Sequence, residues 1–494
     1  MIHACYEGLN SYAACGVQKQ SVAKATPIGT VVQTPSSVSN PSFKGVFSAW
    51  RLRTTLDSRE DRKQYLKLLC KLDREGRNML EYLLKTGILM SKDSQNNTTL
   101  SNLTKIVTTE RAEGLSAKGI LKDTVKTLAN PYNVSQILGD IPSRYAKQVS
   151  STVLADSRQK EATKKPDEHV AILVPSTTSE RQTIDTINDI HSGCCPAASM
   201  EFDLASENPA EFARFAEGLS SKNMAVTKEI DLSSICDNTI DTIWLMNEFK
   251  IPYQAKDFNK ATVTLAPDKN AIIRARIQTT DQNDDERTPL DVLMQSTFMN
   301  VASQQTYDTL TDTRGGKFDE DDDGLIEMEK TFLESIVNNR NTTSVIYQDI
   351  QMEEVTDASG NKSYKQKLAG YTKSTQETKD QIIETLKSGK NVIVGYIFTD
   401  NNNYVLGGHE VTISGIRIND KGQEEFIYND TDSHEYSGKT RDRKPTYVLV
   451  DEFLPKIHHA GIPTEIATKT EQPQTDRLET SVNEFQSMLK GNQA

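Results

Sequence analysis

Three short clusters in the chain carry side chains that could together form a catalytic site. The first, His191-Ser-Gly-Cys-Cys-Pro-Ala-Ala-Ser199, places two thiols, Cys194 and Cys195, where a glycine turn leads into an expected helix. The N-terminus of a helix carries partial positive charge and free backbone N–H groups, so it stabilises a thiolate and a developing oxyanion. This segment predicts a nucleophilic cysteine; the alternative is that both cysteines are small buried hydrophobic residues.

The second and third clusters could supply a base and a group that orients it. Gly407-Gly-His-Glu-Val-Thr-Ile-Ser-Gly415 places His409 at the start of an alternating strand, and Phe426-Ile-Tyr-Asn-Asp-Thr-Asp432 ends the next expected strand. Antiparallel pairing would bring Asn429 or Asp430 beside the imidazole, where either would fix its tautomer. Taken alone, a strand histidine is more often structural, and an Asn-Asp pair after a strand is usually a turn.

The order of these clusters resembles the papain-like cysteine peptidase superfamily. GCCPAAS is similar to the papain pattern in which Gly-x-Cys precedes x-Ala-x-Ser, which puts Cys195 at the nucleophile. It also resembles the Cys-Gly-Pro-Ala opening of the double-glycine leader peptidase-like group, which puts Cys194 there. GGHEVTISGI is similar to the His-Ala-Val-x-x-x-Gly strand of both groups, and FIYND resembles the strand that supplies the third catalytic residue.

The resemblance also implies an oxyanion-hole side chain shortly before the nucleophile. Asn188 fits this place if Cys194 attacks, and Asp189 fits it if Cys195 attacks. An amide can donate to an oxyanion, so this feature favours Cys194 slightly, whereas the Ala-x-Ser match favours Cys195. Both cysteines stay open.

The implied activity is that of a cysteine hydrolase, which cleaves amide or isopeptide bonds of a protein or peptide through a Cys-His-Asp/Asn triad. The sequence does not separate proteolysis from deamidation, deubiquitination or transglutamination. An inactive papain-like fold that serves as a protein-interaction module is the main alternative. The oligomeric state is left open.

The elements that must position these residues predict an α+β fold, with a papain-like helix packed on an antiparallel sheet. Apolar residues at helical spacing predict helices over 57–85, 196–220 and 375–387. Short apolar runs between turn residues predict strands at 391–398, 409–418, 425–428 and 446–450. We expect a flexible leader over 1–45, a helical region over 46–155, a hydrolase domain over 166–465 with a large insertion near 260–380, and a polar tail over 466–494.

An acidic segment, Asp319-Glu-Asp-Asp-Asp-Gly-Leu-Ile-Glu-Met-Glu-Lys330, is similar to an EF-hand calcium loop. Asp319, Asp321 and Asp323 match ligand positions and Gly324 matches the sharp turn, but Lys330 stands where a bidentate glutamate is required. Two interpretations stay open: a calcium site, or a solvated acidic loop that caps a helix beginning near residue 325. A calcium-regulated scaffold is accordingly a third functional hypothesis, and no other cofactor is expected.

Composition excludes several classes of protein. The net charge of −12 argues against a general nucleic-acid binder, and no apolar run approaches the roughly 20 residues of a membrane span. Six cysteines in 494 residues are too sparse for a disulfide scaffold, so a reducing compartment is expected. No Sec-type signal is seen at the N-terminus. We therefore expect a cytoplasmic protein, or one secreted into a host cell without such a signal, as a bacterial virulence effector would be.

Overall fold

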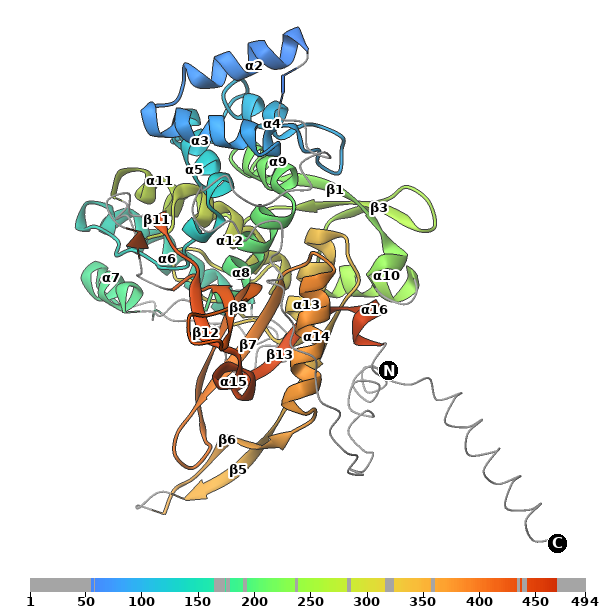
Figure 1. Ribbon diagram of the computed structural model, residues 1–494. Coiled ribbons are helices and arrows are strands. Elements are labelled where there is room, and N and C mark those ends of the chain that lie inside the picture. Colours follow the sequence, from blue (N-terminus) through green and yellow to red (C-terminus); the bar gives the residue numbers. More distant parts are fainter. Residues whose placement is uncertain are drawn as a thin grey trace, which may run out of the picture.

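The computed structural model describes a mixed α+β protein made of a helical half and a sheet half (Figure 1). The described residues are 55–56, 58–163, 174, 178–189, 193–235, 239–281, 286–315, 324–356, 360–432, 436–437 and 442–468. The predicted leader, most of the polar tail and the acidic residues Asp319, Asp321 and Asp323 lie outside them. Among the described residues, no helix combines the length and the apolar character needed to cross a membrane.

The helical half contains most of the helices that precede the main sheet, and polar side chains cap many of them. Asp73 accepts a hydrogen bond from the Gly76 N–H at the start of α3, and Thr288 and Asp291 form a reciprocal capping box at the start of α12. The helices are α2 (Arg59–Leu69), α3 (Arg74–Lys85), α4 (Thr99–Ile106), α5 (Ala117–Ala129), α6 (Ala146–Thr163), α7 (Glu180–Asn188), α8 (Cys195–Glu207), α9 (Pro209–Leu219), α10 (Thr239–Glu248), α11 (Ala271–Asp281), α12 (Pro289–Ala302) and α13 (Glu327–Asn338).

One hydrophobic core runs through this half and reaches the sheet. It joins Leu68 of α2, Phe215 of α9, Phe298 of α12 and Ile393, a residue of the main sheet. Helices α2 to α5, which lie in the region predicted as helical, 46–155, therefore pack continuously against the elements that carry the candidate site. This shared core makes the N-terminal helices part of the support of that site.

The segment predicted as an insertion, near 260–380, supplies part of this core. All residues of α12 are buried, and the helix contacts α5, α8, α9, α11 and α13. A helix that is buried all round has no polar face, so its sequence shows no amphipathic stripe. The same segment also supplies β4 (Thr342–Ile346), an edge strand of the main sheet.

The main sheet is antiparallel and has the strand order β12-β9-β8-β7-β13-β4. Val392 and Val394 of β7 pack with Ile382 of α14, whereas Ile393 between them packs into the helical core. This alternation is that of a strand buried on both faces. The remaining bounds are β7 (Val392–Thr399), β8 (Val405–Ile418), β9 (Glu424–Asn429), β12 (Thr446–Leu449), β13 (Ile457–Pro463), α14 (Thr375–Lys387), α15 (Val450–Phe453) and α16 (Thr464–Ala467).

Three smaller sheets accompany the main one. A three-stranded sheet has the order β1-β3-β2, and a long two-stranded ribbon, β5–β6, projects from the sheet half (Figure 1). A short pair, β10–β11, follows β9. Their bounds are β1 (Val226–Asp231), β2 (Tyr253–Ala255), β3 (Lys260–Leu265), β5 (Gln348–Thr356), β6 (Lys362–Tyr371), β10 (Tyr436–Ser437) and β11 (Asp442–Arg443).

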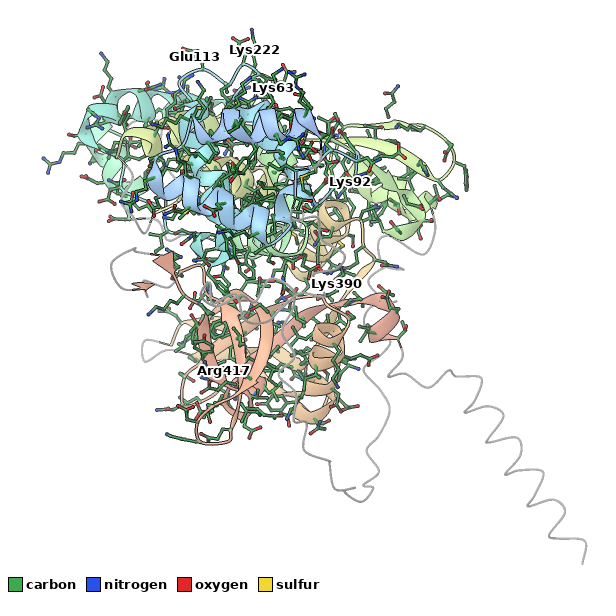
Figure 2. The ribbon with its side chains drawn as sticks, turned by 45° about the horizontal axis from the view of Figure 1, so that its top comes forward. Lys63, Lys92, Glu113, Lys222, Lys390 and Arg417 are labelled. Atoms are coloured by element: carbon green, nitrogen blue, oxygen red, sulfur yellow. The ribbon has the colours of Figure 1, made fainter. Side chains whose placement is uncertain are left out.

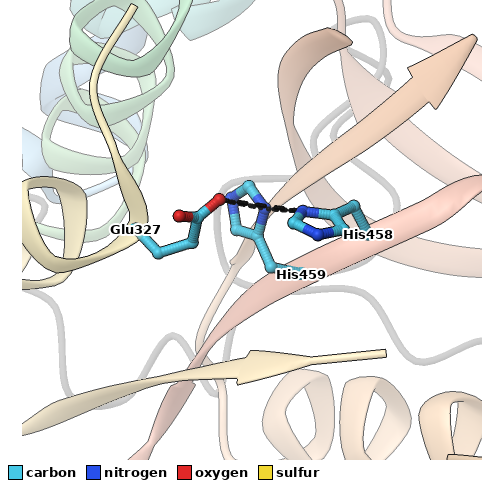
Figure 3. A group of neighbouring side chains, drawn as sticks. All are labelled: Glu327, His458 and His459. Carbon is cyan, nitrogen blue, oxygen red and sulfur yellow. Dashed lines mark hydrogen bonds and ion pairs between the residues drawn. The ribbon is translucent and has the colours of Figure 1, made fainter. Parts of the chain in front are cut away.

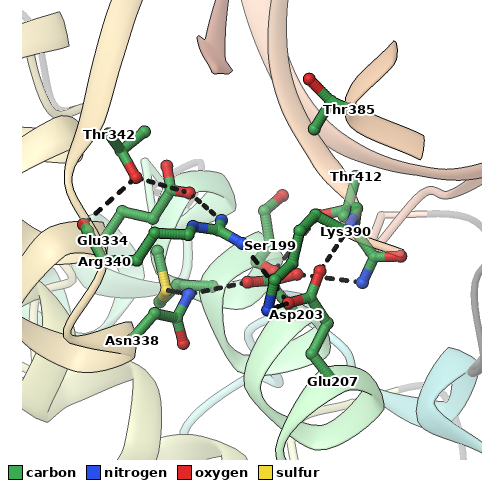
Figure 4. A network of polar contacts seen from close by, with 12 residues as sticks. Ser199, Asp203, Glu207, Glu334, Asn338, Arg340, Thr342, Thr385, Lys390 and Thr412 are labelled. Atoms are coloured by element: carbon green, nitrogen blue, oxygen red, sulfur yellow. Dashed lines mark hydrogen bonds and ion pairs between the residues drawn. The ribbon is translucent and has the colours of Figure 1, made fainter. Parts of the chain in front are cut away.

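A polar network fixes α8 between α13 and the sheet (Figure 4). Asp203 of α8 accepts hydrogen bonds from the side-chain amides of Asn338 (2.8 Å) and Asn391 (2.9 Å). Glu207, one turn further along α8, pairs with Lys390 (3.1 Å) and Arg340 (3.4 Å). Lys390 lies where the two halves meet, as the labelled side chains of Figure 2 show. The far end of α8 is thus held from both sides.

Several predicted elements are confirmed. The helix predicted over 375–387 is α14, and the four predicted strands are β7, β8, β9 and β12. The single helix predicted over 196–220 is two helices, α8 and α9, because Pro209 begins a new helix after the Asn208 cap. The papain-like details of the predicted fold class remain an expectation.

Candidate active site

Cys195 is the first residue of α8 and is partly exposed. Pro196 follows it, in the first turn, where a missing N–H is tolerated. The first backbone hydrogen bond of the helix runs from Ala198 N–H to Cys194 O (3.0 Å). The N–H of Cys195 therefore makes no hydrogen bond within the helix, as is true of the first N–H groups of any helix. These groups form the positive end of the helix dipole.

His409 of β8 joins Cys195 to Asp430. Its Nε2 lies 3.0 Å from Asp430 Oδ1, just beyond the end of β9, and the Cys195 side chain lies near enough to the imidazole to raise its pKa. Asp430 engages Nε2, which leaves Nδ1 available for the thiol. The structure thus assembles one residue from each of the three clusters into a chain of thiol, imidazole and carboxylate.

Two hydrogen bonds fix α8 on the strand that carries His409. The Ser199 hydroxyl donates to the Glu410 carbonyl (3.3 Å), and the Thr412 hydroxyl donates to the Ser199 carbonyl (3.2 Å). Ala197 and Ala198, both fully buried, let the helix approach the sheet closely. The small residues after the cysteine pair therefore set the distance between the thiol and the imidazole.

The environment of His409 favours the imidazolium. Burial alone would lower its pKa, but the hydrogen bond to Asp430 and the interactions with the Asp430 and Cys195 side chains raise it to about 10. Burial would likewise raise the pKa of Asp430, yet its hydrogen bond to His409 holds that pKa below its usual value. Tyr396 covers the site with its ring edge-on to the imidazole, at 5.8 Å between centroids.

Cys194 occupies a different environment from Cys195. It is fully buried, and its Sγ donates to Gln295 Oε1 (3.6 Å). Burial raises the pKa of its thiol well above the usual range, which disfavours the nucleophilic thiolate. The slight preference for Cys194 drawn from the sequence is therefore not supported by the geometry: Cys195, not Cys194, meets His409.

The other predicted residues are not brought to the thiol. Asn429, the last residue of β9, is buried, and its Nδ2 has no hydrogen-bond partner among the described residues. Asn188 ends α7, where its Oδ1 accepts from the Ile141 N–H (2.9 Å), and Asp189 is exposed. Within the described part of the chain, no contact joins either residue to Cys195 or His409.

The calcium site stays a prediction, because Asp319, Asp321 and Asp323 lie outside the described residues, but the residues at the end of the acidic segment are described. Glu329, the acid nearest to the required glutamate, is fully buried against Arg314, and Lys330 pairs with Glu410 (2.8 Å). Neither residue is available as the last calcium ligand, because each forms an ion pair with another residue. The helix expected after the acidic loop is confirmed as α13, which begins at Glu327.

Arg443 is a positioning residue that the sequence reasoning missed. Its Nη1 donates to the Thr431 carbonyl (2.8 Å) and its Nη2 to the Ser135 hydroxyl (2.8 Å). Thr431 follows Asp430 directly, so Arg443 ties the end of β9 to the loop after α5. A buried arginine in a short, weakly patterned segment carries no signal that sequence periodicity could detect.

No protein-family model, no curated protein and no solved structure matches the chain. The catalytic interpretation therefore rests on the residues of this site alone.

Proposed function

We propose that the chain is a cysteine hydrolase of papain-like chemistry that acts on amide or isopeptide bonds of a protein or peptide. Cys195 is the nucleophile, His409 the general base and acid, and Asp430 the residue that orients the imidazole. The observation that carries the proposal is that His409 is hydrogen-bonded to Asp430 and also interacts with Cys195, the first residue of a helix.

The reaction follows from these positions. The Cys195 thiolate attacks the carbonyl carbon, and the N–H of Cys195 donates to the developing oxyanion. His409 gives its Nδ1 proton to the departing amine, which leaves a thioester on Cys195. His409 then takes a proton from an attacking water; the second tetrahedral intermediate breaks its C–S bond, which releases the acid and regenerates the thiolate and imidazolium. An amine in place of that water would give transfer instead of hydrolysis.

Iodoacetamide labelling, mapped by mass spectrometry to each cysteine, tests the proposal. Cys195 should be labelled rapidly below about pH 7, because only a paired thiolate reacts well there, and His409→Ala should abolish this rapid labelling. Cys194 should stay unlabelled in the folded chain. If Cys195 reacts no faster than the exposed Cys70, which serves as the internal control, the resting protein has no activated thiol and an inactive interaction module is the better interpretation.

The removal of the Asp430 charge should move the alkaline limit of the reactive state. The raised pKa of His409 means that the imidazolium stabilises the fold fully below pH 6.5 and that this contribution is lost as pH rises through about 10. In Asp430→Asn the pKa of His409 should fall by about 1–3 units. Above a certain pH, His409 no longer affects the rate at which Cys195 is labelled, and in Asp430→Asn this pH should be lower than in the wild type. Iodoacetamide labelling from pH 6 to pH 11 measures it.

Asn429→Ala is the matched control for that experiment, because Asn429 is the adjacent residue and makes no contact with the imidazole. Its pH profile should equal that of the wild type. Equal shifts in Asp430→Asn and Asn429→Ala would contradict the assignment of Asp430 as the orienting residue.

A further inference from the structure

Three side chains of types that can bind metals lie close together where the start of α13 meets β13 (Figure 3). The Nδ1 atoms of His458 and His459 lie 3.2 Å apart. Glu327 Oε1 lies 3.7 Å from His458 Nδ1 and 3.5 Å from His459 Nδ1. The three atoms form a nearly equilateral triangle, and each belongs to a side-chain type that binds transition metals.

The size of this triangle matches a single zinc ion. Zinc bonds to histidine nitrogen and carboxylate oxygen are about 2.0–2.2 Å long, so tetrahedral ligands lie about 3.3 Å from one another. A hydrogen bond could account for one of the three separations. It does not explain why two imidazole nitrogens and a carboxylate oxygen all meet at one point.

A β-bulge builds the site. In the pairing of β13 with β7, Ile457 faces Tyr396 and His459 faces Gly395, so His458 is an extra residue. Consecutive side chains of a regular strand point to opposite faces, whereas a bulge can turn two neighbours toward one point. Gly395 makes room for the second ring, because a Cβ there would lie 2.0 Å from His459 Cε1.

A second carboxylate orients the buried histidine. Glu410 Oε1 lies 3.5 Å from His459 Nε2, on the side of the ring away from the triangle. When Nε2 carries the ring proton, it can direct that proton to this carboxylate, as metal-binding histidines commonly do, and Nδ1 is then deprotonated and able to bind a metal. Glu410 directly follows His409, so the same strand serves the thiol site and the histidine pair.

The charges around the triangle suit a dication. Lys330 lies 3.2 Å from His459 Nε2, but its ammonium is neutralised by Glu410 at 2.8 Å. The carboxylate of Glu327 then adds a negative charge beside the two imidazole rings. Its side chain is 35% exposed, so a water or a group from a bound molecule can reach the remaining ligand position.

We propose that Glu327, His458 and His459 bind one zinc ion with three protein ligands and an open fourth position. The inference goes beyond the proposed hydrolase reaction and does not depend on it. The ion would join α13 to β13. It would bind His459, which contacts Glu410 on the strand that carries His409.

Isothermal titration with zinc chloride tests the site in the full chain carrying Cys195→Ala, after chelator treatment and dialysis. The substitution removes the thiol, which would otherwise bind zinc together with His409. One zinc ion per chain should bind. His458→Gln and Glu327→Gln, each added to this background, should weaken binding by at least about 10-fold.

Glu377→Gln is the matched control, since Glu377 also lies in the first turn of a helix, α14, and has no histidine partner in the described structure. It should leave zinc binding unchanged. Should His458→Gln fail to fold, the more exposed Glu327→Gln decides alone. Absence of stoichiometric binding in the Cys195→Ala chain, or binding that neither ligand substitution weakens, would overturn the proposal.

Discussion

Cys195→Ala should abolish hydrolysis of an activated ester or peptide substrate, with a loss of at least about 1,000-fold in kcat/KM. The reason is that Cys195 alone of the cysteine pair meets His409, at the first residue of α8. The loss should appear in kcat, because in the proposed reaction the thiol makes and breaks the covalent bond. A burst of product followed by a slower steady rate should be seen with the wild type and be absent from the variant.

Cys194→Ala is the control that separates the two cysteines. Its thiol is buried against Gln295, so the substitution should cost about 1 kcal/mol of unfolding free energy while the burst remains. Hydrolysis should stay within a few fold of the wild type once the rate is corrected for the folded fraction measured by circular dichroism. Loss of the burst in Cys194→Ala and its survival in Cys195→Ala would reverse the assignment.

Sequence patterns located the three clusters because each has a local signature. Glycine turns, alternating apolar residues and the small residues after the cysteines all act within one element, so the helix containing Cys195 and the strand containing His409 could be predicted. The choice between Cys194 and Cys195 depends on burial by α12 and Gln295, which lie about 100 residues further along the chain. Likewise, the choice between Asp430 and Asn429 as the partner of His409 depends on the direction in which the end of β9 points each side chain.

The elements that the sequence did not predict share a physical reason. Helix α12 is buried on all sides and has no amphipathic period, and β13 is a bulged strand whose alternation breaks at His458. The spacing between Cys195 and His409 led to the prediction of an insertion near 260–380. Part of that segment, α12, lies in the core. Local patterns cannot show this, because a core is defined by contacts between distant residues.

Glu329→Ala should produce a large loss of stability. Glu329 and Arg314 form a bidentate ion pair, and their side chains are 0% and 1% exposed, respectively. Arg314 Nη1 also donates to the Gly324 carbonyl (2.8 Å). Removal of the carboxylate leaves a buried guanidinium without its counter-charge, which costs about 3–5 kcal/mol. The same carboxylate accepts the Ile326 N–H (3.0 Å), so the start of α13 also loses its cap. The urea midpoint of unfolding measures the effect.

The exposed ion pair of Glu81 and Lys85 gives the comparison, since both side chains are 53% exposed on α3. Glu81→Ala should change the unfolding free energy by no more than about 0.5 kcal/mol, because solvent screens the pair. A double variant, Glu329→Leu with Arg314→Met, should recover much of the loss, since it removes both buried charges together. Equal urea midpoints for Glu329→Ala and Glu81→Ala would show that the Arg314 pair does not stabilise α13. In that case the start of α13, and Glu327 with it, must be held by the contacts of this helix with β4, α12 and α8.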